Sequence, residues 1–193
     1  MPRWLAGFAE RHGEPAVSVE AGVVTLTGPD GEVAECHAPP GVPAPAGPAD
    51  LAEAPTGRLG LLLARRGGFA VGLVEGAALI ASKVDSRYVQ SRTAAGGWSQ
   101  QRFARRRDNQ AKAAAGEAAD ECARLLLPDV RRLDAFVTGG DRQLVDAVLA
   151  DPRLAPLRAL RSDRFLAVPD PKRAVLEAAV ASSRAVRIRL HSR

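Results

Sequence analysis

The stretch TAAGGWSQQRFARRR, residues 93–107, marks the point at which the pattern of the chain changes. Before it, apolar runs at residues 58–65, 68–76 and 78–89 are separated by short connections that contain glycine. Connections this short leave room only for antiparallel neighbours. The sequence therefore predicts a three-stranded meander that ends just before the glycine pair.

After this stretch the spacing of apolar residues becomes helical. Ala111, Ala115, Ala118 and Cys122 belong to a series that recurs at helical intervals until Pro128 interrupts it. A recurrence of this kind predicts one long helix of about seven turns. Ser99 is suited to be its N-cap and Gln100 its first residue, with the arginines of its first half turned outward.

Beyond Pro128 the pattern alternates between strand and helix. Apolar runs at 133–140, 164–169 and 185–191 predict strands, and helical spacing appears between them, once directly after Asp141. Alternation of this kind requires crossover connections, which produce parallel strands. The predicted fold class is α/β, with an antiparallel meander extended by parallel strands into a mixed sheet and with helices on its faces.

The first forty residues predict a smaller structure of their own. A short amphipathic helix through Trp4, Leu5 and Phe8 precedes two β-rich runs around the turn signal Pro29-Asp30-Gly31. The Pro- and Ala-rich segment that follows cannot hold a continuous strand or helix. We therefore expect a hairpin extension with a linker over residues 1–57 and the main domain over residues 58–193.

The positive charge of the chain is concentrated around the quoted stretch. The 193 residues carry a formal net charge of +5, and residues 83–112 alone hold eight basic and two acidic residues. A cluster of this kind is typical of a surface that binds phosphate. The alternative is an ordinary solvated helix face.

Other common chemistries have little support in the sequence. Cys36 and Cys122 form no CxxC pair, and the three histidines have no ligand spacing, so we expect no metal and no cofactor. Cys36 and His37 are neighbours on a predicted strand and should point to opposite faces. No apolar run has the length of a signal peptide or a membrane span. We expect a cytoplasmic monomer that does not bind membranes.

The two glycines give the loop an unusual freedom of approach. Gly96 and Gly97 permit backbone conformations that other residues avoid, and the helix that follows presents free N–H donors at its first turn. Such a loop can approach an anion or a developing oxyanion closely. The alternative is a strand-to-helix turn that needs glycine for its shape alone.

The residues after the glycines carry a more specific signal. Gly96 and Gly97, Ser99, the run Arg102–Arg105 and Arg107 closely resemble the segment that follows the Gly-Gly-Gln loop in the middle domain of class I peptide release factors of eukaryotes and archaea. The resemblance implies an RNase H-like α/β domain whose loop enters the peptidyl transferase centre of the large ribosomal subunit. There it would promote hydrolysis of the peptidyl-tRNA ester.

One departure from that pattern points to a particular branch. Trp98 stands where the release factors have glutamine, and a glutamine follows two positions later as Gln100. The loop Gly97-Trp98-Ser99-Gln100 therefore resembles the Gly-x-x-Gln loop of the Vms-type release-factor-like peptidyl-tRNA hydrolases of ribosome quality control, in a short actinobacterial form. Trp98 either stacks on a base or braces the loop.

The resemblance assigns roles to individual residues. Gly96, Gly97 and Gln100 would form the catalytic loop, with Gln101 as the neighbouring candidate for the catalytic glutamine. A glutamine amide has no useful pKa, but its carbonyl can orient a water and its NH₂ group can donate a hydrogen bond. Contacts with rRNA and tRNA, chiefly to phosphates, would come from Arg92, Trp98, Gln101, Arg102, Arg105, Arg106, Arg107 and Lys112.

Two alternative functions follow from other features. Pelota-like rescue factors are similar in their middle domain but lack the Gly-Gly-Gln loop, so the chain is alternatively a non-catalytic ribosome-binding module. The missing glutamine at position 98 favours this alternative, whereas Gly96, Gly97 and Gln100 oppose it. A nuclease on an RNase H-like sheet would need clustered carboxylates for its metal ions, and no such cluster stands out.

Overall fold

The computed structural model describes residues 1–52, 56–86 and 99–191. It divides the chain into two compact units. The N-terminal unit comprises Met1–Thr56 together with Arg184–Arg193, and the mixed-sheet unit comprises Gly57–Ser183. The last ten residues of the chain therefore belong to the unit that contains the first residues.

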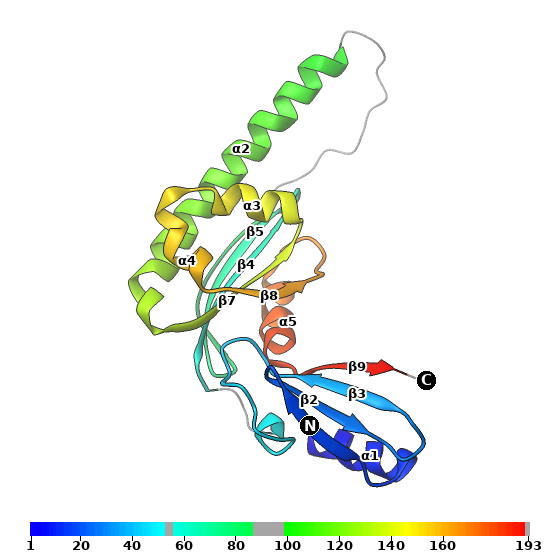
Figure 1. Cartoon of the computed structure of the whole chain (residues 1–193). Helices are drawn as coiled ribbons and strands as arrows, with labels where there is room; N and C mark the ends of the chain where they lie inside the picture. The colour runs from blue at the N-terminus through cyan, green and yellow to red at the C-terminus, as the bar shows by residue number, and fades with distance from the viewer. Residues whose placement is uncertain (53–55, 87–98, 192–193) are drawn as a thin grey trace. The chain divides into compact units, whose positions relative to one another are not determined.

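A five-stranded sheet forms the centre of the mixed-sheet unit (Figure 1). Its strand order is β6-β5-β4-β7-β8. Both β4–β5 and β5–β6 pair antiparallel, while β7 pairs parallel with β4 and with β8. This arrangement confirms the predicted α/β class, with a meander extended by parallel strands as in RNase H-like domains. The strands are β4 (Arg58–Arg65), β5 (Gly68–Glu75), β6 (Ala78–Ser86), β7 (Leu133–Gly140) and β8 (Arg161–Leu166).

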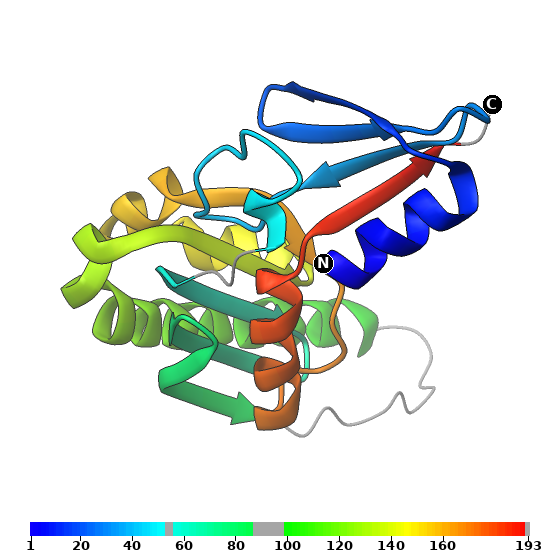
Figure 2. The same ribbon diagram turned by 90° about the horizontal axis from the view of Figure 1, so that it is seen from below.

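The helices cover both faces of this sheet, as Figure 2 shows. One face packs against α2 (Ser99–Leu126), α3 (Arg142–Leu149) and α4 (Ala155–Ala159), and the other packs against α5 (Arg173–Arg184). The 28 residues of α2 confirm the predicted long helix, which ends two residues before Pro128. Asp141 caps α3, because its side chain accepts a hydrogen bond from the backbone N–H of Leu144.

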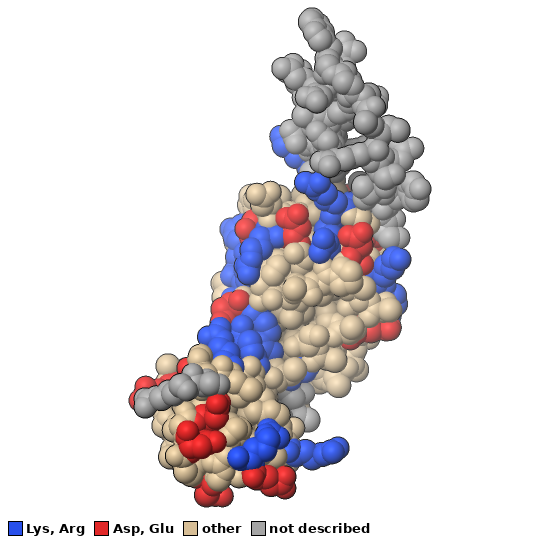
Figure 3. All heavy atoms as spheres, turned by 90° about the vertical axis from the view of Figure 1, so that its right-hand side faces the viewer, with Lys and Arg blue, Asp and Glu red and all other residues tan. Residues whose placement is uncertain are grey.

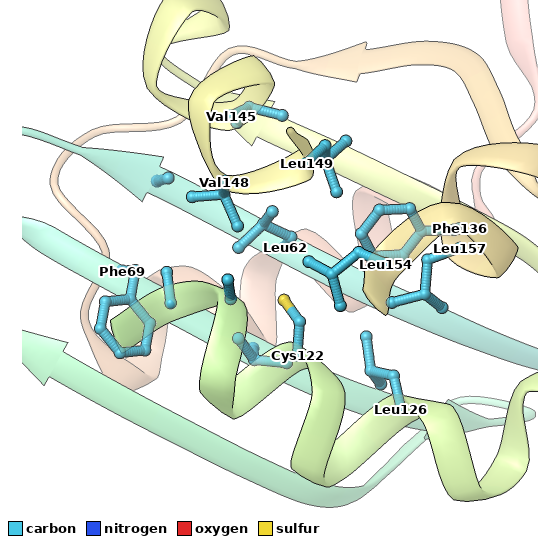
Figure 4. Packing of buried hydrophobic residues seen from close by; sticks show 14 of the residues in the cluster. Leu62, Phe69, Cys122, Leu126, Phe136, Val145, Val148, Leu149, Leu154 and Leu157 are labelled. Atoms are coloured by element: carbon cyan, nitrogen blue, oxygen red, sulfur yellow. The ribbon is translucent and has the colours of Figure 1, made fainter. Parts of the chain in front are cut away.

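The larger of the two cores in this unit lies between the sheet and α2, α3 and α4. Leu62 of β4, Phe136 of β7 and Cys122 of α2 are all fully buried there. Figure 4 shows these side chains packed together with leucines and valines from the shorter helices. Burial of this apolar surface holds the C-terminal half of α2 on the sheet.

The first forty residues contain one strand more than the sequence suggested. The four-stranded sheet of the N-terminal unit has the order β1-β2-β3-β9, with α1 (Pro2–His12) packed on one face. The expected hairpin around Pro29-Asp30-Gly31 is present between β2 (Val23–Thr27) and β3 (Val33–His37).

The additional strand, β1 (Ala16–Glu20), pairs with β2 through a turn at Ala21 and Gly22. Both turn residues have positive φ, of 48° and 76°, which a two-residue hairpin turn of this kind requires. Alanine rarely adopts such a conformation, so residues 21 and 22 carry no clear turn signal.

The prediction for the last strand was wrong. Residues 185–191 were expected to extend the mixed sheet, but β9 (Arg187–His191) pairs antiparallel with β3 instead. The element type was predicted correctly and its partner was not. An isolated strand pattern carries no information about which sheet edge will supply the hydrogen bonds.

Candidate functional site

Four strands of the mixed sheet end at the same edge. Because β4, β6, β7 and β8 run in one direction, their last residues Arg65, Ser86, Gly140 and Leu166 lie together. We call this side of the sheet the carboxyl edge. The chain leaves this edge at Ser86, and the described structure resumes at Ser99, the first residue of α2.

The long helix α2 reaches well beyond the carboxyl edge (Figure 1). Among its described side chains, the first buried one is Ala115, and Ala118, Cys122 and Leu126 follow. Ser99 precedes Ala115 by 16 residues, which at 1.5 Å per residue amounts to about 24 Å of helix. We call residues 99–113 the α2 arm. The arm therefore places the backbone of Gln100, in its first turn, away from the packed body of the unit.

The predicted site residues fall into three groups in the structure. Arg92, Gly96, Gly97 and Trp98 lie outside the described residues. Lys112 is exposed on the arm. The backbone is helical at the remaining ones, which are Gln100, Gln101, Arg102, Arg105, Arg106 and Arg107.

The helix begins one residue earlier than predicted. Ser99, expected as the N-cap, is the first residue of α2, and Gln100 is the second. A difference of one residue at a helix end is within the usual variation of such boundaries. Gln100 and Gln101 therefore both belong to the first turn, and their positions differ by about 100° around the helix axis.

The charge pattern of the arm is unfavourable for a helix in isolation. The first turn contains no acidic residue, although the N-terminal end of a helix favours negative charge. Arg102 and Arg106 are spaced four apart, a spacing at which like charges destabilise a helix by about 0.2–0.5 kcal/mol. A polyanion beside the arm would relieve both effects. The pattern is thus suited to a phosphate-rich partner.

Two ion-pair groups fix the opposite end of α2 to the body of the unit. Arg153 donates to Asp120 of α2 at 2.7 Å and to Asp151 at 2.6 Å. The hydrogen bond from Arg153 and the backbone N–H of the same residue lower the pKa of Asp151. Just after α2, Asp129 accepts a hydrogen bond from Arg58 at 2.5 Å. Together with the core, these contacts hold the C-terminal half of α2 on the body of the unit.

The cysteines of the chain are not arranged for nucleophilic chemistry. Cys36 and Cys122 are free and fully buried. Burial raises the pKa of both thiols, that of Cys122 to about 12, so neither supplies a thiolate at neutral pH.

The described ranges, 1–52, 56–86 and 99–191, contain neither a cluster of metal ligands nor a helix suited to span a membrane. No group of three or more His, Cys, Asp or Glu side chains within them is placed to hold a metal ion. None of the helices there combines the length and the apolar character needed to cross a membrane.

Sequence reasoning missed several cations of the carboxyl edge. Arg66 follows β4, Arg142 follows β7 and Lys172 follows β8 in the chain, and all three are exposed. The available signal was their position directly after predicted strands, since strands that run in parallel end on the same side. Their common location became visible only with the strand order.

Known proteins resemble this chain to different degrees. Residues 57–189 match the family described as "Actinobacteria/chloroflexi VLRF1 release factor". An archaeal translation termination factor, aRF1, is similar in structure, with 16% identity and a TM-score of 0.47 over 82% of this chain and 48% of that chain. A second structure, described as "Archaeal protein", has 16% identity and a TM-score of 0.43 over 80% and 48%. No curated protein matches by sequence.

This chain therefore spans about half the length of the two solved structures that it resembles. The family match is broader, since it covers more than half of the chain and includes the glycine pair, Gln100 and the whole of α2. It confirms the resemblance to the Vms-type branch that the loop sequence indicated. On the strength of this match, the chain belongs to the VLRF1 release-factor family of Actinobacteria and Chloroflexi.

Proposed function

We propose that this protein is a ribosome-dependent peptidyl-tRNA hydrolase that frees nascent chains from stalled ribosomes or large subunits in the cytoplasm. The observation that carries the proposal is the family match over residues 57–189. The matched region includes a Gly-x-x-Gln sequence at 97–100. The reach of the α2 arm supports it, because a catalytic loop must extend from the domain to enter a narrow ribosomal site.

The proposed reaction is hydrolysis of an ester. A water molecule adds to the carbonyl carbon that joins the peptide to the ribose oxygen of the terminal tRNA nucleotide. The carbon–oxygen bond to the ribose then breaks, the ribose oxygen takes up one proton of the water, and the peptide leaves as a carboxylate while the other proton passes to solvent. Gln100 would orient the water through its side-chain carbonyl and would donate from its NH₂ group to the developing oxyanion.

The glycines and the arginines have separate tasks in this mechanism. Gly96 and Gly97 would let the backbone approach the tRNA end without a Cβ in the way. Arg102, Arg105 and Arg106 would bind RNA phosphates and set the position of the loop without reading base sequence. Since proximity and orientation provide most of the catalysis, no cofactor is required.

A second candidate function is a pelota-like module that binds the ribosome and does not cleave the ester. Trp98 favours it, because this residue occupies the position of the release-factor glutamine. Such a module would use the same basic arm to bind the ribosome. It would act through partner proteins, so peptide release would not depend on Gln100.

One experiment separates the two candidates. Large subunits that carry a radiolabelled peptidyl-tRNA are incubated with the full-length protein, and free peptide is separated from peptidyl-tRNA by gel electrophoresis. We expect release with the wild-type protein and none with Gln100→Ala, while puromycin releases the peptide in a parallel sample and shows that the substrate is reactive. Binding of the wild-type protein without release would favour the pelota-like module.

A further inference from the structure

Many basic residues on the side of the mixed-sheet unit opposite the arm are neutralised by carboxylates. Arg58 contacts Glu75 and Asp129, at 2.7 and 2.5 Å. Arg132 shares Asp129 at 3.5 Å. Further pairs are Arg124 with Glu121, Arg153 with Asp120 and Asp151, and Arg161 with Asp146.

The cations of the carboxyl edge show a different pattern. Arg66, Arg142 and Lys172 are exposed, and none has an ion pair with another described residue. Arg131 and Arg158, on the opposite side, are exposed arginines that depart from this division, and Arg158 donates to backbone carbonyls. The contrast matters because the cations without a carboxylate gather on the side from which the α2 arm projects.

Asp141, Asp170 and Glu177 have other partners, and none of them forms an ion pair with these cations. Asp170 contacts Arg65 at 3.4 Å, and Asp141 caps α3. Glu177 pairs with Arg173 at 2.6 Å. Figure 3 shows acidic side chains between the basic ones near this end of the unit, consistent with these local pairs.

Long-range contacts bring the edge cations together from separate parts of the chain. Arg65 donates to the backbone carbonyl of Val168 at 2.8 Å, which holds the turn after β4 against the segment after β8. Arg66 lies in that turn, and Lys172 lies in that segment. The guanidinium carbon of Arg142 lies 4.1 Å from the centre of the Phe165 ring of β8, so this side chain is also held at the edge.

We infer that Arg66, Arg142 and Lys172 form a second phosphate-binding surface, which contacts the backbone of ribosomal RNA beside the α2 arm. The inference rests on the proposed function in that it takes ribosomal RNA as the partner of the arm. An RNA that binds the arm is brought close to the edge from which the arm extends. Exposed cations without carboxylates then exchange their counterions for phosphates.

Two variants of equal charge test this surface. The edge variant carries Arg66→Gln and Lys172→Gln, which spares Arg142 because its ring contact supports β8. The control variant carries Arg124→Gln and Arg131→Gln on the opposite side. Both lose two positive charges on exposed side chains, and thermal unfolding confirms that each is folded.

Co-sedimentation with purified large ribosomal subunits is measured over a series of KCl concentrations. We expect the edge variant to bind about tenfold more weakly at moderate salt. The slope of its log binding constant against log KCl concentration should be smaller in magnitude by roughly one for each lost phosphate contact. The control variant should bind within about twofold of the wild-type protein. If the two variants bind equally weakly, the proposed surface is refuted, because the loss of net positive charge would then explain the weaker binding.

The release assay separates this inference from the proposed function. If the wild-type protein binds subunits and releases peptide while the edge variant binds as well as the control, the hydrolase assignment stands and the surface is refuted. If the wild-type protein binds but releases no peptide, and the edge variant alone binds more weakly, the surface stands and the hydrolase assignment fails.

Discussion

Arg58 and Asp129 are joined by a hydrogen bond of 2.5 Å although 71 residues separate them in the chain. Arg58 is the first residue of β4, and Asp129 follows the end of α2. Arg58 also donates to Glu75 at the end of β5, at 2.7 Å. One guanidinium therefore links the C-terminal end of α2 to two strands of the meander, on the side opposite the α2 arm.

This contact predicts a pH-dependent contribution to stability. The hydrogen bond from Arg58, followed by its charge, lowers the pKa of Glu75 in the folded protein. The stabilisation is therefore fully present above the ordinary glutamate pKa of about 4.3 and is lost as the pH falls through the lowered value. In urea unfolding, Arg58→Gln should be less stable than the wild-type protein at neutral pH, and the difference should shrink in acid.

An exposed arginine without such partners is the control for this measurement. Arg131→Gln should leave the urea midpoint nearly unchanged across the same pH range, because surface substitutions of this kind usually stay within about 0.5 kcal/mol. A difference between wild type and Arg58→Gln that is independent of pH would contradict the role given to Glu75.

The two glutamines of the arm should differ in function. Gln100 completes the Gly-x-x-Gln spacing, whereas Gln101 stands at another angle on the same helical turn. Gln100→Ala should abolish peptide release and leave binding to the large subunit intact, because an interaction used only in the transition state affects turnover. Gln101→Ala should have a milder effect. Full peptide release by Gln100→Ala would refute a catalytic role for Gln100. Loss of release in Gln101→Ala alone would assign that role to Gln101.

Gly97 should be needed for access to the tRNA end more than for folding. The Gly97→Ala substitution adds a Cβ and narrows the backbone conformations that are open to the loop. Release should fall while the thermal unfolding temperature stays close to that of the wild-type protein. A parallel loss of stability and activity would instead identify the glycine pair as a structural turn.

The arginines of the arm should govern association with the ribosome. Arg105→Glu combined with Arg106→Glu reverses two positive charges on the arm, which should weaken co-sedimentation with large subunits and flatten its dependence on salt. Peptide release at saturating protein should recover part of the loss, since these residues are expected to position the loop and not to take part in the reaction. Unchanged association at moderate salt would contradict an RNA-binding role for the arm.

Both cysteines should be unreactive in the folded protein. Burial, and to a smaller extent the charge of Glu121, raise the pKa of Cys122 to about 12, and burial raises that of Cys36. Because the thiolate is the reactive form, a thiol-specific disulfide reagent should label neither residue until urea is added. Rapid labelling of the folded protein would show that one of the cores opens readily.

The sequence by itself determined most of the local structure and the candidate loop. The change from strand-like apolar runs to helical spacing of apolar residues predicted the meander and α2, and Pro128 indicated where α2 would stop. Asp141 marked the start of α3. These features depend on residues close together in the chain, so local propensity and periodicity are sufficient to predict them. The specific spacing of Gly96, Gly97 and Gln100 likewise needed no structure.

Tertiary structure alone decided which distant segments meet. It paired β9 with β3 and not with the mixed sheet, and it placed Arg58 beside Asp129. It also brought Arg66 and Lys172 to the edge from which the α2 arm extends. Strand pairing and ion pairing depend on groups that are far apart in sequence and become neighbours only when the apolar faces are buried. The arrangement of charges at the carboxyl edge therefore depends on the order of strands in the sheet. The periodicity of a single segment does not encode that order.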